Sequence, residues 1–159
     1  MSHVDSESPR RARTEVLQVA LQSLHPAYFA LVMATGIVSI AAQLEGMRSI
    51  AIALFWINLL AYALLWLLTL GRLTLYFPRF LDDFTDHARA PGFFTAVAGT
   101  GVLGSQCIVL FGQREAAFVL WGVELLLWIV ITYGIFTALI VKREKPEFIR
   151  GLTAGWLVS

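Results

Sequence analysis

The chain has 159 residues, of which 58% are hydrophobic and only 14% are charged. A soluble domain carries about 45–50% apolar and about 25% charged residues, so the apolar excess predicts a chain that lies in a lipid bilayer. The formal net charge of +1 gives no basis for nucleic-acid binding, and the single cysteine, Cys107, excludes an internal disulfide.

The first 24 residues differ in composition from the rest of the chain. Residues 1–13 are polar, with three arginines and a proline, and we expect no stable structure there. Four apolar side chains in residues 14–24 share one helical face. That face predicts either a short helix in the membrane interface or a helix packed on the protein's own loops. We therefore treat residues 1–24 as a polar tail with a possible interfacial helix.

Four long apolar runs follow, and a fifth begins near the last printed residue. The four approach or exceed the length of about 20 helical residues that crosses a hydrocarbon core of about 30 Å. Unpaired backbone groups are too costly in lipid, and no strand-like alternation is present, so the runs must be helices. The predicted spans are 27–43, 50–70, 92–112 and 116–141, with a partial span at 151–159. Residues 25–159 are thus predicted to form an all-α membrane domain of helical hairpins.

The basic residues predict the orientation of these spans. Of the twelve lysines and arginines, ten fall before span one, between spans two and three, or after span four; only Arg48 and Arg114 lie on the other side. Positive residues remain in the cytoplasm. We therefore expect a multi-pass protein of the cell membrane (inner or plasma membrane) with a cytoplasmic N-terminus.

Spans one and three carry faces of small and weakly polar side chains, and the fifth run repeats this chemistry. Such faces either let helices pack closely or line a narrow conduit, in which glycines give room and hydroxyls give weak hydrogen bonds. Spans two and four carry bulky side chains nearly all round, which suits lipid contact. This alternation favours the conduit, with inner odd-numbered helices and outer even-numbered helices. The candidate pore-lining residues are Thr35, Gly36, Ser39, Phe93, Thr100, Gly101, Gly104 and Gly155.

Polar residues elsewhere in the membrane domain are few. Asn58 lies in span two, and Glu124 in span four could couple protons or form a structural hydrogen bond to a neighbouring helix. The polar stretch 77–91 contains aspartates and one histidine, but its interleaved arginines favour solvated loop contacts and a cap for span three over a metal site. No catalytic constellation is visible, so we expect neither an enzyme nor a cofactor or metal site. No lysine or arginine falls inside a predicted span.

Three segments together resemble the tellurite-resistance/C4-dicarboxylate transporter family, which includes slow-type anion channels and sulfite exporters. They are residues 25–39 (HPAYFALVMATGIVS), residues 91–104 with PGFFT and AGTGVLG, and residues 145–158 with KP and GLTAGWLV. The resemblance implies a ten-helix fold of five hairpins around a pore that odd-numbered helices line, and a homotrimer with one pore per subunit. It also implies pore-lining roles for seven of the candidates above, Phe93 excepted. The chain resembles only the first half of such a protein, and the family's gating phenylalanine lies on a ninth helix beyond it.

The leading hypothesis is the N-terminal half of a transporter or channel for small anions, such as C4-dicarboxylates, tellurite or sulfite. Its partners would be the bilayer, the anions and the missing C-terminal half. The alternative is a truncated or split membrane subunit with no transport activity alone. An intramembrane enzyme is disfavoured because the sequence lacks a catalytic constellation.

Overall fold

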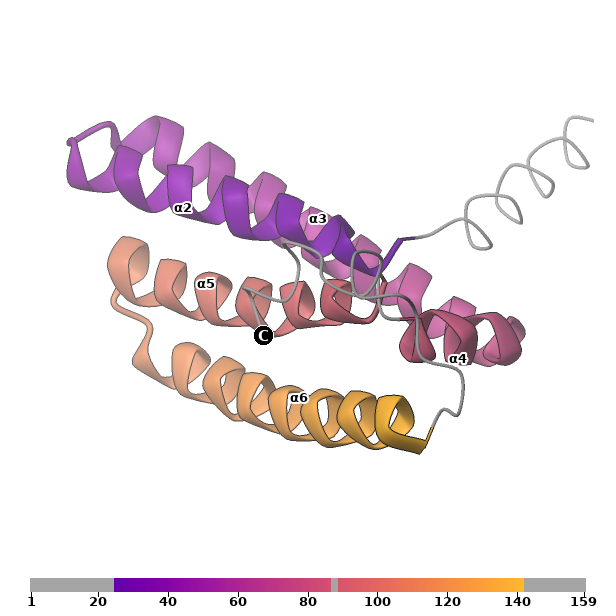
Figure 1. Cartoon of the computed structure of the whole chain (residues 1–159). Coiled ribbons are helices and arrows are strands. Elements are labelled where there is room, and N and C mark those ends of the chain that lie inside the picture. Colours follow the sequence, from indigo (N-terminus) through magenta and orange to yellow (C-terminus); the bar gives the residue numbers. More distant parts are fainter. Residues whose placement is uncertain (1–24, 87–88, 142–159) are drawn as a thin grey trace, which may run out of the picture.

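The computed structural model describes residues 25–86 and 89–141, and every regular element in these ranges is a helix (Figure 1). The expected interfacial helix at 14–24, the partial span at 151–159 and Gly155 lie outside the described residues. The described elements are η1 (Pro26–Phe29), α2 (Ala30–Leu44), α3 (Arg48–Leu75), α4 (Phe77–Thr85), η2 (Ala90–Phe93), α5 (Phe94–Phe111) and α6 (Arg114–Val141).

Four helical segments are long and apolar enough to cross a membrane, which confirms the predicted all-α membrane class. They are Pro26–Leu44, Arg48–Leu75, Ala90–Phe111 and Arg114–Ala138. The second covers 28 residues, so it rises about 42 Å. That length matches a bilayer of about 40–45 Å including its headgroup regions.

The ends of the spans follow from local chemistry. Spans one and three each begin with a 3-10 turn that has a proline at its start, Pro26 and Pro91, where the missing N–H costs nothing. The imidazole Nδ1 of His25 accepts a hydrogen bond of 3.1 Å from the backbone N–H of Ala27 and so caps the first turn. At the opposite side of the membrane, Gly112 ends α5 in the left-handed region with φ 65°, a conformation that glycine adopts without strain.

Helix α5 is the central helix of the described bundle. It packs against α2, α3 and α6, whereas α2 pairs mainly with α3 and α5. In Figure 1, α2, α5 and α6 lie in sequence beside one another, with α3 behind α2. Of the span that contains α5, 61% is buried, against 28%, 17% and 11% for the spans of α2, α3 and α6. Within the described bundle, α5 is therefore the buried helix, and most of the surface of α3 and α6 is exposed.

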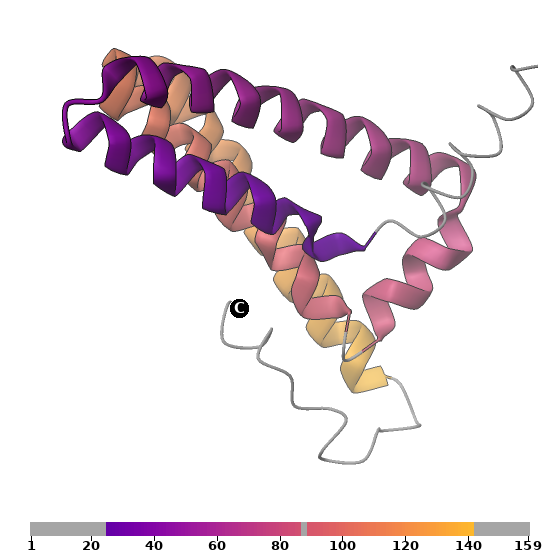
Figure 2. The ribbon, with the colours of Figure 1, turned by 90° about the horizontal axis from the view of Figure 1, so that it is seen from above.

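The interpretation of residues 77–91 as a solvated loop was wrong. Residues Phe77–Thr85 form α4, which joins the C-terminal end of α3 to the start of α5 (Figure 2). Its apolar side carries Phe80 and Phe84, which pack with buried residues of η2, α5 and α6. Its Asp83 is buried and forms ion pairs with Arg72, at 2.6 Å, and with Arg89.

Helix α3 also extends beyond the predicted span, which ended at residue 70. The last turns reach Leu75 and bury Arg72, so the expectation that the spanning helices hold no arginine needs correction. The buried guanidinium is tolerable because the carboxylate of Asp83 compensates its charge. Local composition cannot show this partnership, since Arg72 and Asp83 lie on different helices.

Candidate functional site

One narrow strip of α5 is left open by the helices around it. Between Phe94 and Leu110, the part-exposed and exposed residues recur at spacings of three and four, whereas the other residues are buried. This spacing places them on one face of the helix. We refer to this face as the open stripe. It comprises Ala98, Gly101, Val102, Ser105, Ile108 and Val109.

On one side, the open stripe borders α2 at Gly36. A Cβ atom at Gly36 would overlap the side chain of Val102 and would lie 2.9 Å from Nδ2 of Asn58. The missing side chain therefore lets α2 approach both α5 and α3 closely, as small residues do in membrane helix pairs.

A buried amide pair lies beside this contact. Nδ2 of Asn58 on α3 donates a hydrogen bond of 2.6 Å to Oε1 of Gln106 on α5, and both side chains are 0% exposed. Among the described residues, Oδ1 of Asn58 and Nε2 of Gln106 have no hydrogen-bond partner. Sequence reasoning noted Asn58 but missed Gln106, although an amide inside an uncharged run is a signal that could have found it.

Three of the predicted pore-lining residues face α3 rather than the open stripe. The hydroxyl of Ser39 donates to the carbonyl of Ala51 at 2.8 Å, and the Thr100 hydroxyl lies 3.0 Å from the hydroxyl of Tyr62. Thr35 precedes Ser39 by four residues, so it lies on the same side of α2, where it is half-buried. Thr100 is fully buried and also donates to the carbonyl of Ala96 at 2.7 Å.

Gly104 and Phe93 lie in contacts with other neighbours of α5. A Cβ atom at Gly104 would meet Leu120 of α6 at 3.5 Å, an ordinary packing distance. The ring of Phe93 packs edge-on against Phe80 and Phe84 of α4, with centroids 5.2 Å apart in both pairs. Of the predicted residues in the described ranges, Gly101 is the one on the open stripe.

On its other side, the open stripe borders Glu124 of α6. A Cβ atom at Gly101 would lie 2.7 Å from Oε2 of Glu124, too close for any real contact. The carboxyl group therefore occupies the space that a side chain at Gly101 would need. Glu124 is half-buried and forms no hydrogen bond or ion pair with any residue in the described ranges.

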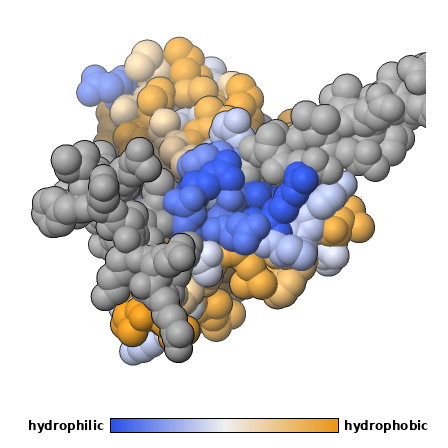
Figure 3. Space-filling model, turned by 45° about the vertical axis from the view of Figure 1, so that its right-hand side comes forward, coloured by the Kyte–Doolittle hydropathy of each residue, from blue (hydrophilic) through white to orange (hydrophobic). Residues whose placement is uncertain are grey.

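A cluster of charged groups lies where α3 ends and α5 begins. Asp83 is shared by Arg72 and Arg89, and Figure 3 shows a hydrophilic patch at this end between apolar flanks. Partial burial, and then the nearby guanidinium of Arg89, lower the pKa of His25 below its ordinary value. The starts of both inner spans meet here, since a Cβ atom at Gly92 would lie 2.9 Å from the backbone nitrogen of Ala27.

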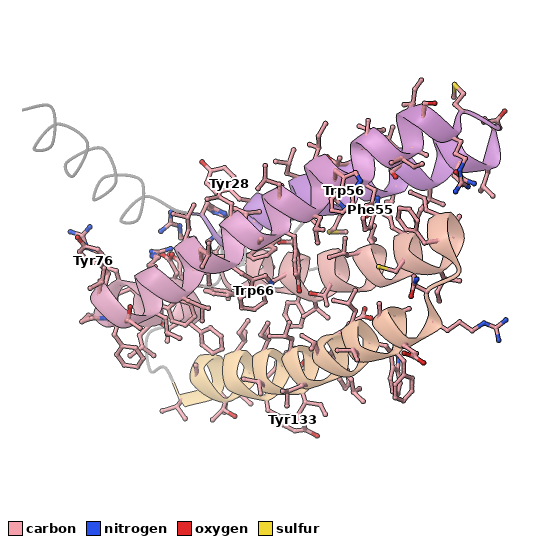
Figure 4. The ribbon with its side chains drawn as sticks, turned by 180° about the vertical axis from the view of Figure 1, so that it is seen from behind. Tyr28, Phe55, Trp56, Trp66, Tyr76 and Tyr133 are labelled. Atoms are coloured by element: carbon pink, nitrogen blue, oxygen red, sulfur yellow. The ribbon has the colours of Figure 1, made fainter. Side chains whose placement is uncertain are left out.

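The lipid-facing surface differs sharply from the open stripe. Bulky side chains such as Trp56, Trp121 and Leu126 are more than half exposed on α3 and α6. Figure 4 shows Tyr133 projecting away from the bundle, whereas Trp66 lies between α3 and α5. No group of three or more potential metal ligands occurs in the part of the chain that the structure describes.

Comparison with known proteins identifies the family but not an individual relative. Residues 23–159 match the SLAC1 family model, described as voltage-dependent anion channel. No curated protein and no solved structure gives a significant match. The match covers both inner spans and both outer spans, and it confirms the resemblance drawn from the sequence motifs. The chain is therefore a multi-pass membrane protein that belongs to the SLAC1 family of voltage-dependent anion channels.

Proposed function

We propose that this chain forms the N-terminal half of a conduit for small anions and that the open stripe of α5 is part of its wall. The observation that carries the proposal is the contrast between this stripe and the other exposed surfaces. The stripe consists of small, uncharged side chains along most of its length, whereas the exposed faces of α3 and α6 are bulky. A smooth wall without fixed cations suits weak binding and fast passage.

In this proposal, odd-numbered spans line the conduit, as the sequence suggested, but the residues divide into two groups. Gly101 belongs to the wall, together with Ala98, Val102 and Ser105. The second group holds the odd-numbered spans to α3, because its members lie on the faces that pack against that helix. These residues are Thr35, Ser39 and Thr100. Gly36, Gly104 and Phe93 bring α2, α6 and α4 close to α5.

The proposed orientation places the N-terminus and the start of α5 in the cytoplasm. Both inner spans then begin at the cytoplasmic mouth, and their helix dipoles turn positive ends toward it. Arg72 and Arg89 lie at the same end, where Asp83 pairs with both, so the helix dipoles supply the positive potential there. This potential would favour anions without a lysine or arginine in the wall itself. C4-dicarboxylates, tellurite and sulfite are the proposed substrate classes.

The complete pore would need further helices, since the described spans surround α5 and not a channel. We therefore include a C-terminal half and a homotrimeric assembly in the proposal. The alternative is a membrane subunit with no transport activity alone. The arrangement of the described spans around α5, and not around a channel, favours this alternative as well. The two differ in whether anion flux requires co-expression with a second polytopic chain.

The test is to obstruct the open stripe. Ser105→Leu adds bulk at an exposed stripe position, and Ala53→Leu adds bulk at an exposed position of α3 as the matched control. Both variants should insert equally. In proteoliposomes, with a second polytopic chain if flux requires one, Ser105→Leu should abolish chloride and malate flux, whereas Ala53→Leu should retain it. Equal flux in the two variants would contradict the assignment of the open stripe to the anion pathway.

A further inference from the structure

Glu124 places a carboxyl group well inside a spanning helix. It follows Arg114, the first residue of α6, by ten positions, so it lies about 15 Å along the helix. A hydrocarbon core is about 30 Å thick, so this carboxyl group is far from either aqueous surface along the helix. Ionisable groups at such depth are costly, and they mark ion pathways or proton sites.

The position of the carboxyl group depends on a single glycine. At Gly101, a Cβ atom would lie 2.7 Å from Cδ and Oε2 of Glu124, so a larger residue there would displace the carboxyl group from this position. Gly101 is part of the open stripe. Gly104, one turn further along α5, instead packs against Leu120 of α6. The outer helix α6 thus brings an ionisable group to the edge of the proposed wall.

Other titratable groups on the elements around α6 lie away from Glu124. Within α6, Arg114 and Glu115 are at the outer end, and Tyr133 projects away from the bundle (Figure 4). On α5, the titratable Cys107 packs with Phe55 and Ala117, on another side of the helix from Gly101. Helix α4 carries Arg79, Asp82 and Asp83, and it meets α6 near Gly134. That contact lies ten residues, or about 15 Å, along α6 from Glu124.

We infer that Glu124 is a proton-controlled valve for the anion pathway. When Glu124 is ionised, its charge repels anions from the open stripe; when it is protonated, anions pass. The inference rests on the proposed function of the open stripe. At an effective dielectric of about 20, a unit charge about 10 Å away lowers anion occupancy by about tenfold. By linkage, a bound anion favours the protonated carboxyl group to the same extent.

The first experiment measures chloride and malate flux in proteoliposomes at a series of pH values, equal on both sides. Glu124→Gln mimics the protonated side chain, and Glu115→Gln is the matched control on the same helix. Flux through the wild type and Glu115→Gln should fall about tenfold as pH rises, whereas flux through Glu124→Gln should stay high. A wild-type pH dependence in Glu124→Gln would overturn the inference.

The second experiment does not depend on transport. Infrared difference spectra of the chain in lipid bilayers, with Glu124→Gln as the reference, follow the protonated carboxyl band of Glu124 against pH. Added chloride or malate should raise the midpoint of this titration by about one pH unit, the equivalent of a tenfold effect. If added chloride or malate leaves the midpoint of this titration unchanged, the valve is overturned even if flux is present. A responsive Glu124 combined with undisturbed flux in Ser105→Leu would overturn the proposed wall instead.

Discussion

Helix α5 meets its two outer neighbours in different ways. Toward α3 it makes hydrogen bonds between side chains: Gln106 accepts one from Asn58, and the hydroxyl groups of Thr100 and Tyr62 share another. Toward α6 it packs through glycines and apolar side chains, with Gly104 against Leu120 and with Val97 and Ile131 in one cluster. Within the described residues, no side-chain hydrogen bond joins α5 to α6.

This difference indicates which parts of the bundle have a fixed register. Hydrogen bonds between buried amides and hydroxyls hold α2, α3 and α5 at defined positions along their axes. Packing of small residues allows a helix to shift slightly at lower cost, because no buried polar group loses its partner. We expect the α3 side to act as a rigid frame and the α6 side, which carries Glu124, to adjust.

The largest effect should come from the ion pairs of Asp83, which lie at the end of this frame where α3 meets α4. Asp83→Asn keeps the volume of the side chain but removes the carboxylate that forms ion pairs with the buried Arg72 and with Arg89. Breaking a buried pair in this way costs about 3–5 kcal/mol. Thermal unfolding in detergent, followed by circular dichroism, should show the loss. Asp82→Asn, at an exposed position of the same helix, is the control; equal stability of the two variants would contradict the assignment.

A smaller effect should distinguish two helix contacts. One is the contact of α2 with α5 and α3 at Gly36, and the other is the contact of α5 with α6 at Gly104. At Gly36, an alanine Cβ would overlap the stiff side chain of Val102 and crowd Nδ2 of Asn58, which Gln106 holds in place. We expect Gly36→Ala to destabilise the protein by about 1–3 kcal/mol. Gly104→Ala meets α6 at ordinary packing distances and should be neutral or slightly stabilising. The same unfolding measurement checks both, and equal losses would show that the α6 side is as rigid as the α3 side.

The spans could be predicted from sequence because apolar length is a local property. The predicted span 27–43 differs by one residue at each end from the helical segment Pro26–Leu44. The second span was five residues too short at its C-terminal end because Arg72 is typical of a loop until its partner on α4 is known. Helix α4 was missed for the same reason: its polar residues suggest a solvated loop unless Asp83 is known to pair with the buried Arg72 and with Arg89.

The candidate site could be predicted only in part. The small-residue character of spans one and three was visible in the sequence, and so were Gly101 and Glu124. Which way each face turns was not visible, because it depends on partners such as Tyr62 and the carbonyl of Ala51 on another helix. Periodicity places Thr100 and Gly104 on one face, but the structure divides that face between α3 and α6.

The smallest effect should come from His25, which lies outside the spanning segments and caps the first turn of span one. Partial burial and Arg89 lower the pKa of His25 in the folded protein below the ordinary value of 6.5. The unfolded chain therefore binds more protons between these two pKa values, so stability rises with pH across that window and falls on acidification below pH 6.5. The loss should be small because the side chain is only partly buried. His25→Asn keeps a capping acceptor but cannot titrate, so its unfolding temperature should depend less on pH in this window. Nitrogen NMR of labelled histidine, with His25→Asn to assign the signal, should give a midpoint below 6.5; a midpoint above that value would contradict the lowering of the pKa by burial and by Arg89.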